Sequence, residues 1–214
     1  MNLIPLVWLI PLPPLIAFTL IVLFTHRWKA LSQALAIGMM GASFVLAQVV
    51  FWNGVLGGRL AEEPLTSSVA WLPFRDLESW LRVGVLVDPL TAVMLFMVTL
   101  TCLLIFIYST EYMRGDPRYS RFFAYLSLFA TGMLGLVVAD NLLALFVFWE
   151  VMGLCSYLLI GFWFEKPEAY RAAMKAFMTT RVGDVLMLLG IVYLYSQTGR
   201  LDFQTLLSPD TLAG

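Results

Sequence analysis

The stretch from Asn141 to Trp163 reads NLLALFVFWEVMGLCSYLLIGFW, and it contains one acidic residue, Glu150, and no basic residue. A helix needs about 20 mostly apolar residues to cross the hydrocarbon core of a bilayer, so this stretch is long enough to span a membrane. At about 1.5 Å per residue, Glu150 would lie about 14 Å from the start of such a helix, near the bilayer centre. The stretch therefore predicts a membrane-spanning helix that carries a carboxylate at mid-membrane depth.

The rest of the chain repeats this apolar pattern. Of its 214 residues, 61% are hydrophobic and 13% are charged, and the mean hydropathy is +0.87. Soluble domains are about half apolar and about a quarter charged, so a soluble fold is excluded. We predict an all-α membrane protein with about six transmembrane helices, at residues 3–24, 30–52, 86–108, 121–139, 141–163 and 173–196.

The first predicted span contains four prolines between residues 5 and 14, which predict a kinked or irregular start. It does not fit a cleaved signal peptide, because the basic residues Arg27 and Lys29 follow the apolar run and the run is too long. Two further spans have clear helix starts. Asp88 precedes Pro89 at the start of one span, and Asp140-Asn141 is expected to cap the span that holds Glu150.

The long connection after the second span has a pattern of its own. Valines at 83, 85 and 87 alternate with other residues, and a similar apolar stretch surrounds Trp71 and Phe74. This pattern predicts either a β-hairpin outside the membrane or an interfacial helix anchored by Trp80, and the hairpin is favoured. The chain then divides into helices 1–2 (1–52), this external connection (53–85), helix 3 with its loop (86–119), helices 4–6 (120–197) and a final external loop (198–214).

Basic residues in the short loops predict the orientation of the chain. They gather in the first, third and fifth connections: Arg27, Lys29, Arg114, Arg118, Arg121, Lys166 and Arg171. This distribution places these loops in the cytoplasm and the N-terminus outside. We expect a multi-pass protein of the bacterial plasma membrane, with a thylakoid or other energy-transducing membrane as the alternative.

The buried charges are the candidate functional residues. A charged group at the bilayer centre costs about 2.5–3.5 kcal/mol, and such residues usually mark ion or proton routes. Arg181 and Asp184 lie three residues apart on one helix face and can form an ion pair, while Lys175 either joins them or reaches the headgroups. Gly153, one turn beyond Glu150, permits close helix contact or a bound water.

Other chemistries find little support in the sequence. The net charge of -1 argues against a nucleic-acid partner, and the single His26 argues against a histidine-built metal site. Cys102 and Cys155 are interpreted as small buried hydrophobes. No cofactor is expected in this chain, because it offers no flavin, haem or iron–sulfur ligand set. Aromatic residues are interpreted as packing or interfacial residues, with a quinone site as the alternative for Trp149, Tyr157 and Trp163.

Several motifs together resemble one known family. They are Phe122-Phe123-Ala124-Tyr125, Ala139-Asp140-Asn141-Leu142-Leu143, Phe148-Trp149-Glu150, the run from Gly153 to Trp163, Lys175-Ala176-Phe177 and Thr180-Arg181-Val182-Gly183-Asp184. They are similar to the NuoL/NdhF-type antiporter-like membrane subunit of respiratory complex I, most densely from Val87 to Asp202. The resemblance also extends to subunits of Na+/H+ antiporters and bicarbonate-uptake complexes.

The resemblance implies a fold and roles for the charged residues. In the family, the glutamate that matches Glu150 pairs with a lysine on a broken seventh helix, and residues that match Arg181 and Asp184 tune this pair. The family's chains are longer and contain two inverted five-helix repeats, the first of which would begin at the fourth span here. The 214 residues stop after three helices of that repeat, so we expect a fragment or a second polypeptide that supplies the remainder.

The leading hypothesis is therefore a non-redox subunit, or the N-terminal portion of one, of a proton-pumping NADH or ferredoxin:quinone oxidoreductase. Glu150, Arg181, Asp184 and Lys175 are the predicted proton-translocating residues. The expected partners are the lipid bilayer and other membrane subunits of complex I or of an antiporter complex. The alternatives are a subunit of a multisubunit Na+/H+ antiporter or bicarbonate-uptake complex, and a purely structural membrane scaffold.

Overall fold

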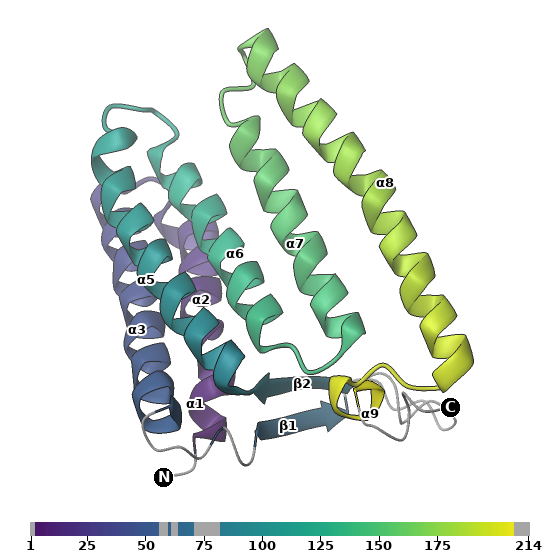
Figure 1. Cartoon of the computed structure of the whole chain (residues 1–214). Coiled ribbons are helices and arrows are strands. Elements are labelled where there is room, and N and C mark those ends of the chain that lie inside the picture. The colour runs from purple at the N-terminus through teal and green to yellow at the C-terminus, as the bar shows by residue number, and fades with distance from the viewer. Residues whose placement is uncertain (1–2, 56–59, 61–63, 71–81, 208–214) are drawn as a thin grey trace.

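The computed structural model describes residues 3–55, 60, 64–70 and 82–207. Among these residues, six helical segments are long and apolar enough to cross a membrane, which confirms the six predicted spans. They run as a bundle of up-and-down helices (Figure 1). The five regular spans after the first are α3 (Lys29–Val55), α5 (Pro89–Tyr112), α6 (Tyr119–Val138), α7 (Leu142–Ile160) and α8 (Pro167–Thr198).

The first span is irregular, as its prolines predict. It consists of α1 (Ile4–Leu9), α2 (Leu12–Leu20) and a π-helical turn, η1 (Ile21–Thr25). Pro14 has no N–H, so the carbonyl of Ile10, four residues earlier, loses its helical donor. The buried hydroxyl of Ser43 on α3 donates to this carbonyl oxygen at 2.7 Å. A polar side chain of a neighbouring helix thereby satisfies the backbone group that the proline leaves free, as the bilayer interior requires.

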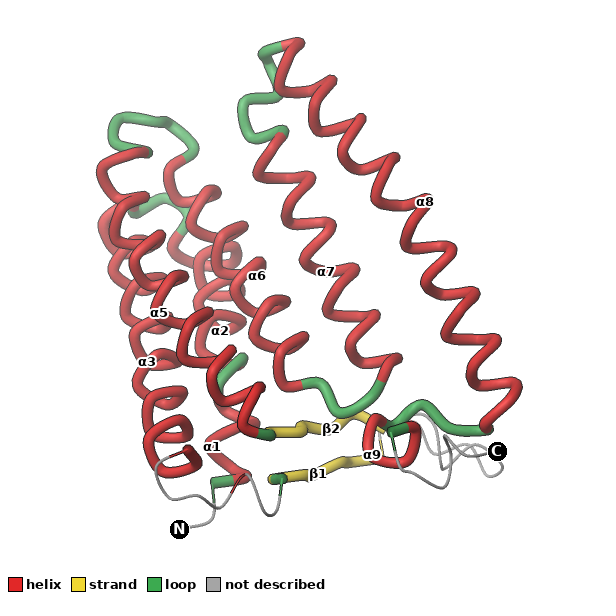
Figure 2. Tube along the Cα trace, in the orientation of Figure 1, coloured by secondary structure: helices red, strands yellow, loops and turns green. Residues whose placement is uncertain are grey.

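The connection after α3 contains a two-stranded antiparallel hairpin, β1 (Leu65–Ala70) and β2 (Arg82–Val87). Its register places Leu65 opposite Val87. The side chains of Val85 and Val87 are buried, so one face of β2 packs against the bundle. Figure 2 shows the hairpin lying across one end of the helices. For these residues the prediction of a β-hairpin is confirmed, and the alternative of an interfacial helix is not. Three aromatic residues of the prediction lie outside the described residues: Trp71, Phe74 and Trp80.

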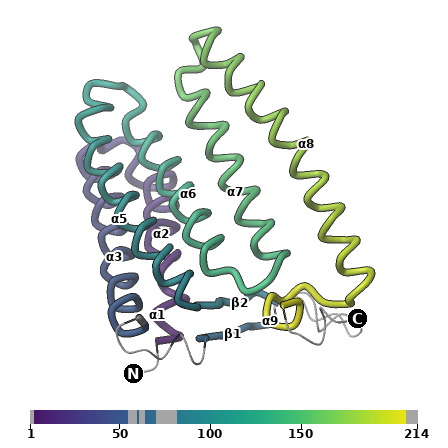
Figure 3. Tube along the Cα trace, in the orientation of Figure 1, coloured from purple at the N-terminus to yellow at the C-terminus, as the bar shows by residue number. Residues whose placement is uncertain are grey.

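The hairpin defines the two ends of the bundle. The hairpin, the short helix α9 (Phe203–Leu206) and the α6–α7 connection lie at one end, which we call the hairpin end (Figure 3). The connections 113–118 and 161–166 lie at the other end, which we call the basic end. The side chain of Lys29, at the start of α3, donates to the carbonyl oxygen of Asp116 at 2.7 Å, so the connection before α3 also belongs to the basic end.

The helix starts follow the predicted capping chemistry with one difference. Asp88 accepts a hydrogen bond from the N–H of Thr91 at 2.7 Å, so it caps α5 as predicted. At α7 the cap is Asn141, which accepts from the N–H of Ala144 at 2.8 Å. The expectation that Asp140 shares this capping is wrong. Its carboxylate lies against Gly84 of β2, where a Cβ atom would clash with it.

The helices differ strongly in how much of their surface is covered. Along the membrane-spanning stretch of α6, 56% of the residues are buried, whereas the figure is 11% for both α7 and α8. Large apolar side chains cover the outer face of α8, and Val182, Val185 and Leu189 are all more than half exposed. The core therefore lies among α1, α2, α3, α5 and α6, and α7 joins α8 to this core from one side.

Candidate functional site

The intramembrane carboxylate occupies the middle of its helix. Glu150 is the ninth of the 19 residues of α7, and its side chain is 26% exposed. It lies about 12 Å along the axis from Leu142, close to mid-span. The side chain points toward α8, where it meets a guanidinium. The structure therefore places the predicted acid against a cationic partner on the neighbouring span.

Arg181 on α8 joins two carboxylates. It forms an ion pair with Glu150 across the interface, and its Nη1 lies 3.5 Å from Oδ2 of Asp184 on its own helix. Its guanidinium also lies 4.5 Å from the ring centroid of Phe177, one turn earlier on α8. The predicted Arg181–Asp184 ion pair is thus present, and the same guanidinium extends it to Glu150. These interactions offset part of the cost of holding three charges away from water.

Asp184 has a second partner on α7. The indole N–H of Trp149 donates to Oδ1 of Asp184 at 2.9 Å, and Asp184 is 7% exposed. Trp149 and Glu150 are adjacent in sequence, so one short segment of α7 contacts both Asp184 and Arg181. We call Trp149, Glu150, Arg181 and Asp184 the charged seam. It holds two carboxylates and one guanidinium, which gives a formal charge of -1 when both acids are ionised.

Small residues line the contact between α7 and α8. Gly153 lies beside the guanidinium: a Cβ atom at this position would make ordinary van der Waals contact, at 3.8 Å, with Nη2 of Arg181. The neighbouring hydroxyls bond to their own helices: Ser156 donates to the carbonyl of Met152 at 3.0 Å, and Thr180 donates to that of Phe177 at 2.9 Å. Each hydroxyl keeps lone pairs available to a water molecule.

Lys175 is the one predicted site residue that the structure leaves apart from the charged seam. It is exposed, and it takes part in none of the ion pairs found among the described residues. It lies six residues before Arg181 on α8, which is about 9 Å nearer the basic end. Trp149 and Phe177 are partners that the sequence reasoning missed. The spacing of four between Phe177 and Arg181 is a signal that could have found one of them.

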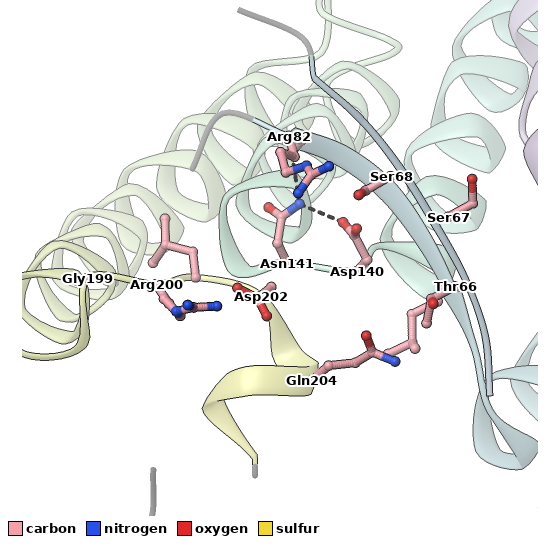
Figure 4. Close-up of a pocket in the computed structure, with 12 residues that line it drawn as sticks. Thr66, Ser67, Ser68, Arg82, Asp140, Asn141, Gly199, Arg200, Asp202 and Gln204 are labelled. Atoms are coloured by element: carbon pink, nitrogen blue, oxygen red, sulfur yellow. Dashed lines mark hydrogen bonds between the residues drawn. The ribbon is translucent and has the colours of Figure 1, made fainter. Parts of the chain in front are cut away.

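A second polar cluster lies at the hairpin end (Figure 4). The amide of Asn141 donates to the carbonyl of Arg82 at 2.9 Å and to the carboxylate of Asp140 at 2.6 Å. These residues border a pocket of about 550 Å³ between β1, β2 and the segment 199–204. Burial raises the pKa of the Asp140 carboxyl, although the hydrogen bond from Asn141 partly opposes this effect. The cluster joins the hairpin to the α6–α7 and α8–α9 connections.

A third polar cluster holds two connections together at the basic end. Arg118 donates to both carboxylate oxygens of Glu165, at 2.7 and 3.0 Å, and its guanidinium lies 5.4 Å from the ring of Phe162. Next to it, the indole N–H of Trp163 donates to Asp116 at 3.0 Å. The bonds from Arg118 lower the pKa of the Glu165 carboxyl. The α5–α6 connection is thereby tied to the α7–α8 connection.

Two protein families match the sequence. The family "NADH:quinone oxidoreductase/Mrp antiporter, TM" matches residues 139–212, which include the whole charged seam. The family "NADH-Ubiquinone oxidoreductase (complex I), chain 5 N-terminus" matches residues 71–123. The two matches together cover β2, α5, the start of α6, α7, α8 and α9.

Curated relatives match nearly the whole chain. Subunit 5 of the chloroplast NAD(P)H-quinone oxidoreductase of Nephroselmis olivacea is 47% identical over 94% of this chain. Chain 5 of the NAD(P)H-quinone oxidoreductase of a Synechocystis strain is 40% identical over 94% of it. The matched region makes up 31% and 30% of these two relatives, so the chain spans about a third of their length.

Solved structures share the fold. A chain of the membrane-bound sulfane sulfur reductase, an archaeal respiratory membrane complex, superposes with a TM-score of 0.80 over 96% of this chain and 40% of its own, at 19% identity. A chain of the Mrp complex from Dietzia sp. superposes with a TM-score of 0.74 over 96% of this chain and 21% of its own, at 23% identity. The arrangement of α1 to α8 is therefore shared with chains of these two membrane complexes.

Proposed function

Because the chain belongs to the family of antiporter-like membrane subunits that NADH:quinone oxidoreductases and Mrp antiporters share, we propose that it forms the N-terminal part of a non-redox, proton-translocating subunit of an NAD(P)H:quinone oxidoreductase. The observation that carries this proposal is the charged seam. Two carboxylates and one guanidinium meet at mid-membrane depth, where charge is expensive and usually functional.

The proton balance of the seam supports this role. With both acids ionised, the seam has a formal charge of -1, and one proton on Glu150 or Asp184 brings it to zero. Removing a net charge from a low-dielectric site is favourable, so the seam is suited to take up a single proton. Arg181 contacts both acids and can remain paired with whichever one is ionised. A positive charge brought near the seam would favour release of the proton.

In this proposal Glu150 is the protonatable site, and Arg181 and Asp184 set its proton affinity. Lys175 lies about 9 Å nearer the basic end than Arg181, and acts as a separate modulator at the entrance from that side. The relatives named above are parts of multisubunit complexes, and we propose that this chain likewise assembles with other membrane subunits. A longer chain or a second polypeptide supplies the remaining helices of the repeat. The membrane is an energy-transducing one, with the N-terminus and the hairpin outside and the basic end in the cytoplasm or its equivalent.

The direct test replaces Glu150 with Gln in the full-length protein within its assembled complex. Glu150→Gln keeps the shape of the side chain but removes the titrating carboxylate. We expect quinone reduction to lose at least half of its rate and proton pumping, measured as acidification of closed vesicles, to fall further than the redox rate. Glu168→Gln is the matched control, because Glu168 is exposed at the start of α8 and lies outside the seam. Unchanged pumping per quinone reduced in Glu150→Gln would remove Glu150 from the mechanism.

The second candidate is a subunit of an Mrp-type cation/proton antiporter. It is favoured by the family description over residues 139–212 and by the structural match to the Mrp complex. The two candidates differ in their driving reaction. Proton movement that starts on addition of electron donor and quinone supports the oxidoreductase, whereas proton movement that starts on imposing a sodium gradient, without quinone, supports the antiporter.

A further inference from the structure

Two clefts follow one another along α8 and meet at Tyr157. The first, of about 190 Å³, lies at the basic end between α6, α7 and the start of α8. The second, of about 180 Å³, lies deeper between α7 and α8 and reaches Trp149 and Asp184. Tyr157 lines both clefts, and its ring centroid lies 5.0 Å from that of Phe177. We call the two clefts together the α7–α8 groove.

The basic end of the groove is rich in hydrogen-bond donors. Among the described residues that line the first cleft, Arg121 is the only one with a charged side chain. Its guanidinium lies 5.8 Å from the ring of Tyr125, and none of the ion pairs among the described residues involves it. The side chains of Tyr125, Tyr157 and Tyr170 line the same cleft. A guanidinium with tyrosine hydroxyls is a donor set that suits a phosphate group.

The deep part of the groove is suited to a hydrocarbon chain. Its lining is mainly apolar and includes Met152, Ile160, Ala176 and Phe177. From Ala173 in the first cleft to Asp184 in the second, α8 rises about 17 Å. This distance is close to half the thickness of the hydrocarbon core, about 15 Å, which is the depth of one lipid leaflet. The groove therefore has the polarity and the length of a single phospholipid that stands in its own leaflet.

We propose that the α7–α8 groove binds one anionic phospholipid, with its phosphate on Arg121 and one acyl chain between α7 and α8. The single cationic side chain matches the single negative phosphate. The acyl chain ends beside Trp149 and Asp184, so the lipid covers one side of the charged seam. This site is independent of the proposed function, because it depends only on the groove.

Lipid binding to the full-length protein in its complex, stripped of lipid in mild detergent, tests this proposal by native mass spectrometry. The probes are phosphatidylglycerol, which is anionic, and phosphatidylcholine, which has no net charge. We expect one phosphatidylglycerol molecule to bind tightly and phosphatidylcholine to bind more weakly. Arg121→Gln should lower the affinity for phosphatidylglycerol about fivefold or more, and Arg121→Lys should retain most of this affinity. Arg171→Gln is the control, because Arg171 is exposed on α8 and lines neither cleft.

A second variant tests the acyl chain separately. Ala176→Phe fills the deep cleft without changing the charge, so it should lower the affinity for both lipids to a similar extent. Equal affinity of the wild type for both lipids, or an unchanged affinity in Arg121→Gln, would overturn the proposal. So would full displacement of the lipid by inorganic phosphate alone, which would mark a plain anion site, or displacement at lower concentration by an uncharged long-chain quinone.

Discussion

Arg181 is the residue on which the charged seam depends. It is the one cation that contacts Glu150 and Asp184 in the described residues, and its own side chain is 28% exposed. We predict that Arg181→Gln destabilises the full-length protein by about 3–5 kcal/mol, because it leaves the buried carboxylate of Asp184 and the partly buried carboxylate of Glu150 without a counter-charge. Thermal unfolding in detergent measures the effect. The double variant Arg181→Gln/Glu150→Gln should recover a part of the loss, because it removes one of the unpaired charges.

Arg171→Gln serves as the control for this prediction, since Arg171 is exposed and lies outside the seam. A loss in Arg181→Gln that the second substitution does not reduce at all would show that the two residues are not coupled. Trp149 offers an independent check at the same scale. Trp149→Phe removes the N–H that Asp184 accepts and should lower stability by about 1–3 kcal/mol, since the carboxylate is buried.

At the scale of elements, the start of α7 fixes how the two halves of the fold meet. Asn141 caps α7 and bonds to the carbonyl of Arg82, and the N–H of Leu142 donates to the carbonyl of Leu201 at 3.0 Å. Two adjacent residues, Asn141 and Leu142, thus connect α7, β2 and the α8–α9 connection. We predict that Asn141→Ala lowers the unfolding free energy by about 1–3 kcal/mol, from the lost cap and the unsatisfied carbonyl.

Asn53→Ala is the matched control, because Asn53 is exposed on α3 and, within the part of the chain that the structure describes, its amide bonds only to the carbonyl of Val49 in the same helix. Chemical unfolding of the two variants should separate them by at least about 1 kcal/mol. Equal stability of both variants would mean that the contacts of Asn141 do not hold the hairpin end together.

At the scale of the whole molecule, the contacts of Asp116 at the basic end contribute stability that depends on pH. Burial alone would raise the pKa of Asp116, but hydrogen bonds from Trp163 and the Arg118 N–H, together with the charges of Arg118 and Lys29, lower it below the ordinary value of 3.8. The unfolded chain therefore binds this proton at a higher pH than the folded protein does. The stability that Asp116 contributes is present above about pH 3.8 and is lost as the pH falls below it.

We predict that Asp116→Asn lowers the melting temperature at neutral pH and that its difference from the wild type shrinks as the pH falls below 3.8. Melting curves across this range measure the change. Asp88→Asn is the control, because Asn can still cap a helix and Asp88 lies at the hairpin end. A difference between wild type and Asp116→Asn that stays constant down to the lowest pH would contradict the linkage.

The local sequence predicts much of the fold. Each span is an apolar block, and the first is broken where prolines remove backbone donors. The ion pair of Arg181 with Asp184 follows from their spacing of three on one helix. The bond from Trp149 to Asp184 joins residues 35 positions apart, and no local period predicts it. It depends on how α7 and α8 are rotated against each other.

The sequence alone determined the membrane, the spans and the acid near the middle of one span, and it favoured a hairpin, because these follow from hydropathy and from periodicity within one segment. Only the tertiary structure decided which charge meets which. It brought Arg181 to Glu150 and left Lys175 exposed, and it turned Asp140 from a helix cap into a neighbour of the hairpin. The physical reason is that side-chain pairing across helices depends on their relative rotation and depth, which the packing of the whole bundle sets.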